Sequence, residues 1–169
     1  RISFEEGLKI YKSDFNDFYK KLNLDDNTFL GVENLFTNSD GTNDSFLCTF
    51  DEIKNFFNLP EINSTKLCLL IDLGHLAISS NLLKFDRMEF IEKCIKNFGD
   101  RIFEIHISNN DEFKDLHSRI TKDSWQLEVL KYFKDTGMLN GGTVFTYESR
   151  GLTIDQIVKD IDLINSKIN

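Results

Sequence analysis

The sequence predicts an α/β protein whose strands form one parallel sheet. Short β-prone or apolar runs alternate along the chain with longer segments of helical periodicity. The segments between the strands are long enough to serve as right-handed crossovers between parallel strands. No linker or low-complexity stretch divides the chain, so residues 1–169 are expected to form a single domain.

The first unit is a helix followed by a strand. Residues 4–22 place apolar side chains at spacings of three and four, which predicts an amphipathic helix. The β-prone run 28–32 predicts a strand that ends at Glu33. The turn-forming residues 38–45 then predict a loop.

The second unit contains the most apolar strand of the chain. Thr49 or Asp51 is expected to cap a short helix that ends near Pro60. Residues 66–71 predict a buried strand of the parallel type, closed by Asp72. A further helix is expected over residues 87–97.

The third unit repeats this order. Residues 101–105 predict a strand closed by His106, and a polar loop is expected over 109–122. A helix is expected over 123–136, where Gly137 stops it.

The last unit ends on an amphipathic helix. Residues 143–147 predict a strand closed by Glu148, and Thr153 is expected to cap the terminal helix. Its apolar stripe is formed by Ile154, Ile157, Val158, Ile161 and Ile164.

The composition excludes several function classes. With 20 Lys and Arg against 28 Asp and Glu, the net charge is −8, which argues against a mainly electrostatic binder of nucleic acid or anionic membranes. The longest apolar run, 67–71, is far shorter than the ~20 residues of a transmembrane helix. The three cysteines form no CxxC pair, which favours reduced thiols. We therefore expect a soluble, cytoplasmic protein.

Each predicted strand ends in a side chain that can bind a metal ion: Glu33, Asp72, His106 and Glu148. The carboxyl ends of parallel strands lie at one edge of a sheet, where active sites are normally built. Polar residues end many strands, so each one alone would mean little. The occurrence at all four strands favours a functional site.

The other two histidines also lie beside carboxylates. His75 follows Asp72 by three residues, and His117 follows Asp115 by two. Carboxylate oxygens and imidazole nitrogens within reach of one or two cations suit Zn²⁺, Mn²⁺ or Fe²⁺.

These residues lie in segments that resemble a known group of proteins, the xylose-isomerase-like TIM barrels, which include endonuclease IV. The resemblance covers the chain from about Thr28 onward, and its specificity comes from the ordered set of motifs. The segments are Val32-Glu33-Asn34, Asp72-Leu73-Gly74-His75, His106-Ile107-Ser108-Asn109-Asn110, Asp115-Leu116-His117 and Tyr147-Glu148-Ser149-Arg150.

The resemblance implies β/α units of a TIM barrel, about four strands that correspond to the second half of the barrel. Either this chain is then an excised carboxyl-terminal portion of a longer protein, or the amino-terminal half is a separate polypeptide, or half barrels assemble as a homo-oligomer. Two departures from the family pattern are the Ser118–Lys122 loop, where relatives carry a glycine turn, and Asn109, where an acid is frequent.

The resemblance implies that the protein is a sugar isomerase or epimerase. In such an enzyme, a divalent ion such as Mn²⁺ or Mg²⁺ would be bound by Glu33, Asp72, His106 and Glu148. Glu33 and Glu148 would remove and return a proton next to the substrate carbonyl. His75 and Arg150 would orient the hydroxyl groups of the sugar.

Two alternatives stay open. In the endonuclease IV branch, His75, Asp115 and His117 would also be zinc ligands, and abasic DNA would be the substrate. We favour the isomerase because Lys and Arg are scattered and form no evident basic groove. The other alternative is a non-catalytic partial-barrel subunit.

Glu104 lies two residues before His106 and therefore on the same face of the predicted strand. This carboxylate would either act on the site or form an ion pair with a neighbouring lysine, and the sequence does not choose between these roles.

Overall fold

The computed structural model describes residues 3–22, 25, 27–37, 45–58, 66–137 and 142–168. Its four strands form one sheet in the order β1-β2-β3-β4, and every neighbouring pair is parallel. The elements are α1 (Phe4–Lys21), β1 (Leu30–Glu33), α2 (Phe50–Phe57), β2 (Leu67–Asp72), α3 (Leu73–Leu83), α4 (Arg87–Phe98), η2 (Gly99–Arg101), β3 (Ile102–Ile107), α5 (Gln126–Asp135), β4 (Val144–Tyr147) and α6 (Ile154–Ile168). This order confirms the predicted α/β class.

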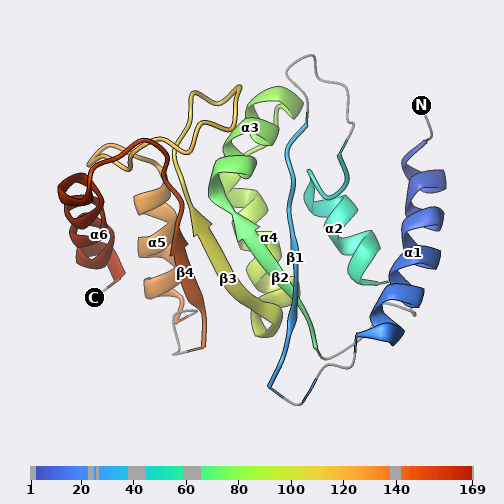
Figure 1. Ribbon diagram of the computed structural model, residues 1–169. Coiled ribbons are helices and arrows are strands. Elements are labelled where there is room, and N and C mark those ends of the chain that lie inside the picture. Colours follow the sequence, from blue (N-terminus) through green and yellow to red (C-terminus); the bar gives the residue numbers. More distant parts are fainter. Residues whose placement is uncertain are drawn as a thin grey trace.

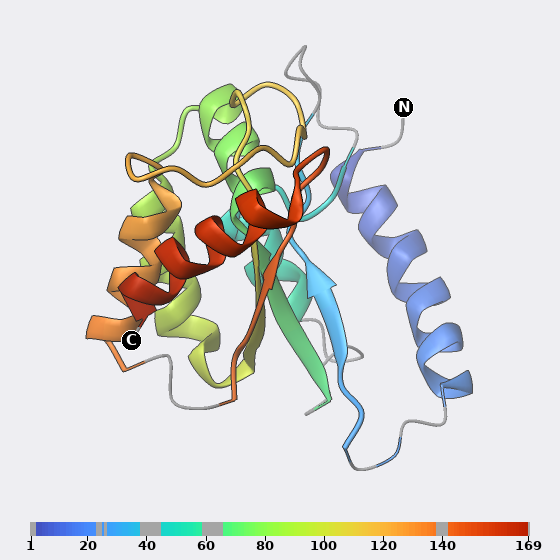
Figure 2. The ribbon, with the colours of Figure 1, turned by 60° about the vertical axis from the view of Figure 1, so that its left-hand side comes forward.

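The helices are arranged around the sheet in a way that leaves one end of the strands for the site. In Figure 1, α4 and α5 lie behind the strands, α2 lies between β1 and α1, and α3 rises from the carboxyl end of β2. Helix α1 stands on the β1 side of the sheet and α6 on the β4 side, as Figure 2 also shows. The two flanks of the sheet therefore carry one helix each.

The two faces of the sheet differ because side chains alternate along each strand. One face packs against the helices and forms the core, with Val32, Leu69, Ile71, Ile105 and Ile107 all buried. The opposite face carries polar side chains that are less buried, among them Glu33, Glu104, His106 and Thr146. The polar face ends at the carboxyl edge, so the predicted site residues share one side of the sheet.

Helix α3 was not expected from the sequence. Apolar and small residues lie on all its sides and its polar residues form no separate face, so no amphipathic stripe marks it as a helix. Its N-cap is Asp72, whose Oδ1 accepts the backbone N–H of His75 at 2.7 Å. Gly74 allows its close approach to the sheet, because a Cβ atom there would lie 2.2 Å from Ser108 Oγ. The Asp72-to-His75 segment is thus the first turn of a helix.

Several predicted boundaries shift by a few residues. His106 lies inside β3, which continues to Ile107. Helix α5 begins at Gln126 instead of residue 123, because Thr121 and Ser124 form a turn closed by a 2.9 Å backbone hydrogen bond. Thr49, rather than Asp51, caps α2 in a capping box with Glu52.

The loop between β1 and α2 is only partly described. Most of the predicted loop, residues 38–44, and Pro60 lie outside the described residues, whereas helix α2 ends at Phe57 with Asn58 as its C-cap, as expected. Within the described part of the chain, no helix combines the length and apolar character needed to cross a bilayer.

Candidate metal centre

Three carboxylates converge on one ring nitrogen, Nδ1 of His106. Glu33 Oε1 lies 3.7 Å from it, Asp72 Oδ2 3.6 Å and Glu148 Oε1 3.5 Å. Glu33 and Asp72 are the last residues of β1 and β2, and Glu148 directly follows β4. The parallel register aligns Asp72 with His106, which explains why residues so distant in sequence meet at one point. All four predicted strand-end residues are therefore brought together.

Asn34 holds Asp72 in place. Its side-chain Oδ1 accepts the backbone N–H of Asp72 at 2.8 Å, and its Nδ2 donates to the Asp72 carbonyl at 3.1 Å. Both residues are buried. The amide thus continues the pairing of β1 with β2 by one residue through a side chain. The sequence gives no sign of this role except that Asn34 follows Glu33 directly.

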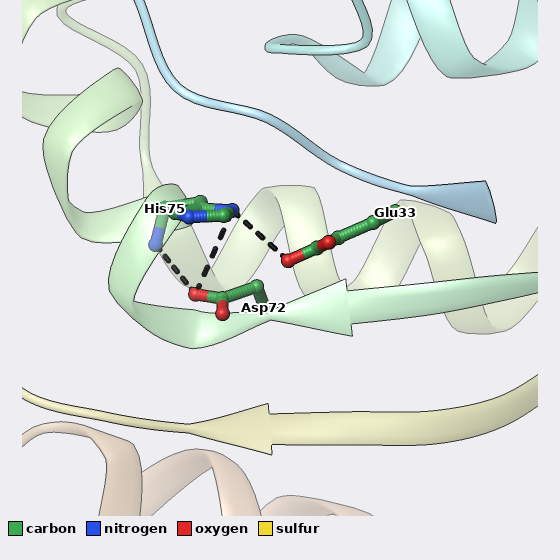
Figure 3. A group of neighbouring side chains, drawn as sticks. All are labelled: Glu33, Asp72 and His75. Atoms are coloured by element: carbon green, nitrogen blue, oxygen red, sulfur yellow. Dashed lines mark hydrogen bonds and ion pairs between the residues drawn. The ribbon is translucent and has the colours of Figure 1, made fainter. Parts of the chain in front are cut away.

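His75 lies beside Glu33 and Asp72 at the start of α3 (Figure 3). Its Nδ1 is 3.2 Å from Glu33 Oε1 and 3.0 Å from the backbone carbonyl of Asn34. Because a carbonyl oxygen only accepts hydrogen bonds, this contact indicates that Nδ1 carries a proton. In this arrangement, His75 is a hydrogen-bond donor and does not offer a lone pair at Nδ1.

The geometry fits a cation. Asp72 Oδ2 and His106 Nδ1 are buried and have no hydrogen-bond partner among the described residues. Buried polar atoms are normally satisfied, and a metal ion would satisfy both of these. Two groups of ligand atoms share Asp72: Glu33, Asp72 and His75, and Asp72, His106 and Glu148. Carboxylate and imidazole ligands suit Mn²⁺, Zn²⁺ or Fe²⁺.

The carboxylates also act on the two histidines. For His106, the adjacent Asp72 carboxylate, 3.6 Å from Nδ1, outweighs burial and, with the charges of Glu148 and Glu33, raises the pKa to about 9. For His75, burial lowers the pKa, but the hydrogen bond with Glu33 and the charge of Asp72 reverse this and raise the pKa to about 9. In the absence of an ion, the cluster holds positive charge as protons on these rings.

Asp115 and His117 form a second group that joins the first through Glu148. His117 Nε2 lies 2.8 Å from Asp115 Oδ2, and its Nδ1 lies 3.4 Å from Glu148 Oε2. The backbone of His117 is left-handed, with φ of +50°. One carboxylate, Glu148, therefore faces the rings of both His106 and His117.

Two residues near this second group differ in their relation to the site. Arg150 is exposed, and its Nη2 lies 3.9 Å from Asp115 Oδ2 at the rim. Asn109 instead supports the loop: its backbone pairs with that of Ser118, and its Nδ2 donates to the Arg119 carbonyl at 3.2 Å. The Asn109 amide thus has a structural role in this loop.

The comparisons with known proteins support the fold. By sequence, the chain matches no family model and no curated protein. Among solved structures, it is similar to a D-tagatose 3-epimerase-like protein, with a TM-score of 0.68 and 20% sequence identity. The match covers 98% of this chain and 54% of that chain, so this chain spans about half the length of the other. The similarity confirms the TIM-barrel type of β/α fold that the motifs led us to expect.

Proposed function

We propose that this chain carries the metal centre of a divalent-metal-dependent sugar or sugar-phosphate isomerase or epimerase. The observation that carries this proposal is the convergence of Glu33, Asp72 and Glu148 within 3.7 Å of His106 Nδ1. The similarity in fold to a D-tagatose 3-epimerase-like protein gives it independent support.

Glu33, Asp72, His106 and Glu148 would hold the ion. A bound divalent cation supplies positive charge that stabilises negative charge developing on a substrate carbonyl oxygen. Asp72 is the most deeply buried of the four and its backbone is fixed by Asn34, so it is the least mobile ligand. Glu33 and Glu148 are each about a third exposed and can face both ion and substrate.

Glu33 and Glu148 would perform the proton transfer. They come from β1 and from the end of β4, on the two sides of His106, so a sugar bound between them has one carboxylate near each face. One carboxylate would remove the proton next to the carbonyl and the other would return a proton. His75 would keep Glu33 in position through its Nδ1 proton and orient a hydroxyl group, and Arg150 at the rim would bind another.

We also propose that four further β/α units complete the barrel around this site. The apolar side chains Ile10 and Phe18 on α1, and Ile154 and Val158 on α6, are exposed at opposite flanks of the sheet. A TIM barrel closes eight strands, whereas the described residues form four and the chain covers 54% of its structural neighbour. The occupant of both flanks would be such a half barrel, as a further part of the polypeptide or as a partner chain.

Solvent exchange into sugars tests the proposal. The full-length protein is stripped of metal, supplied with Mn²⁺, Mg²⁺ or Zn²⁺, and incubated in D₂O with a panel of ketoses and aldoses and their phosphates. We expect metal-dependent deuterium incorporation next to the carbonyl, detected by NMR, and its loss in Glu148→Gln and Glu33→Gln. A matched control is Glu89→Gln, which removes an exposed carboxylate from α4. Absence of exchange with every ion and sugar would contradict the proposal.

A second candidate function is cleavage of abasic DNA. The observation in its favour is that Asp115 and His117 reach Glu148, since a site with one ion does not require them as ligands. This function would bind about three zinc ions and lose activity in His117→Ala, whereas an isomerase would keep part of its activity. Metal content and cleavage of an abasic duplex, with binding that weakens steeply as salt rises, separate the two functions. A protein that binds no ion and performs neither reaction would be a non-catalytic barrel subunit.

A further inference from the structure

Glu104 contacts the nitrogen of His106 that faces away from the three converging carboxylates. The His106 Nε2 atom lies 3.2 Å from Glu104 Oε1, while Nδ1 faces Glu33, Asp72 and Glu148. Both residues lie on the polar face of β3, two positions apart. The ring is therefore bracketed by carboxylates at both nitrogens.

Glu104 is itself anchored by the neighbouring strand. Thr146 on β4 donates its hydroxyl to the same Oε1 atom at 2.6 Å. The register places Thr146 directly beside His106, so the three side chains form a compact group across β3 and β4. Among the described residues, the ion-pair partner of Glu104 is His106, and no lysine takes that place. Of the two roles that the sequence left open for Glu104, the geometry therefore supports an action on the site.

The arrangement has a direct chemical consequence. A neutral imidazole carries one proton, and the nitrogen without it has the lone pair that binds a cation. A carboxylate only accepts hydrogen bonds, so the tautomer that satisfies Glu104 has its proton on Nε2 and its lone pair on Nδ1. Metal-binding histidines are commonly oriented by a carboxylate in this way.

We propose that Glu104 is the positioning residue of the metal centre, which fixes the tautomer and orientation of His106, with Thr146 as its anchor. This inference rests on the proposed metal site. Glu104 does not touch the ion, because it lies on the opposite side of the imidazole ring from Glu33, Asp72 and Glu148. Its carboxylate would also increase the electron density on the ring and strengthen the bond from Nδ1 to the cation.

The test measures metal affinity directly, without reference to activity. Mn²⁺ binding by the full-length protein is followed by the electron paramagnetic resonance signal of free Mn²⁺. We expect Glu104→Ala to weaken binding by about 10- to 100-fold. Thr146→Val should fall between Glu104→Ala and the wild type, because the carboxylate remains but loses its anchor. Glu89→Ala makes the same change of net charge at an exposed position of α4 and should leave affinity unchanged within about twofold.

A second readout reports the tautomer. In the Zn²⁺-loaded protein, the ¹⁵N shifts of the His106 ring should show a proton on Nε2 in the wild type and a weakened preference in Glu104→Ala. Thermal unfolding of the ion-free variants checks that each one folds. If Glu104→Ala does not fold, the comparison of Thr146→Val with the wild type tests the inference. Equal Mn²⁺ affinity and an unchanged tautomer in a folded variant would overturn the inference while the metal site stands. A wild type that binds no divalent ion would overturn the proposed function as well.

Discussion

Ile71, in the middle strand β2, is fully buried, whereas Ile154, at the start of α6 on the β4 flank, is 79% exposed. The same contrast holds for whole regions. Strands β2 and β3 bury nearly all their helix-facing side chains, while α1 and α6 leave large apolar side chains in solvent. The middle of the sheet therefore has its apolar side chains covered within this chain. The apolar side chains of α1 and α6, at the flanks of the sheet, are suited to burial against another surface.

The largest effect is expected from the core of the middle region. Ile71→Ala removes a fully buried side chain between the helices and the sheet and should lower the free energy of unfolding by about 2–5 kcal/mol. Chemical denaturation monitored by circular dichroism measures it. A change below about 1 kcal/mol would mean that the middle of the sheet is as loosely packed as its flanks.

Removal of the proposed ion should be the next largest effect. An ion that binds only the folded state at a free concentration of 100 times its Kd adds about 2.7 kcal/mol of stability. Scanning calorimetry of the full-length protein with Mn²⁺ and then with excess chelator should show this decrease. The melting temperature of Asp72→Asn should be insensitive to the ion, because its buried ligand oxygen is lost; a response equal to that of the wild type would contradict the site.

An ion pair between the partly exposed Arg119 and the buried Asp160 joins the loop after β3 to helix α6. Asp160 on α6 accepts hydrogen bonds from Arg119 at 2.6 Å and from the Tyr147 hydroxyl at 2.7 Å. Asp160→Asn should cost about 1–3 kcal/mol in urea denaturation. The exposed Asp162 on the same helix is the matched control, and Asp162→Asn should change stability little.

The same pair predicts a pH dependence. Hydrogen bonds from Arg119 and Tyr147 lower the pKa of Asp160 below its usual value of 3.8. The contribution of ionised Asp160 to the stability of the folded state is therefore complete above about pH 4. It is lost as the pH falls through the lowered pKa. Asp160→Asn should lack this part of the acid-induced loss of stability. Equal acid sensitivity of variant and wild type would contradict the assignment.

The smallest effect is expected at the flank surface. Val158→Ser replaces an exposed side chain of α6 and should change the stability of this chain by less than about 0.5 kcal/mol. Ile164→Ser, on the buried side of the same helix, should be clearly destabilising. In the complete barrel, Val158→Ser should become costly as well, and an unchanged small effect there would argue against a covered α6 flank.

The sequence predicted what depends on local pattern. The apolar run that ends at Asp72 was enough to predict a strand, and the period of the terminal helix was enough to predict that helix. The order of the strands along the chain placed the four candidate ligands at one edge of the sheet. Helix α3 was not predicted, because a buried helix shows no apolar stripe with a polar face opposite it. The role of Asn34 escaped because it depends on contact with a residue 38 positions away. His75 was expected as a ligand, yet its Nδ1 faces a carbonyl, which only the backbone geometry reveals.

Asp72 divides its two oxygens between different tasks. Oδ1 accepts the backbone N–H of His75 at the first turn of α3, while Oδ2 is the buried oxygen that faces His106. Any ligand that draws charge toward Oδ2 must weaken the hydrogen bond at Oδ1 through the shared carboxylate. The amide of His75 is therefore a natural spectroscopic probe: its chemical shift and exchange rate should report occupancy of the centre, in a single resonance, before any reaction is measured.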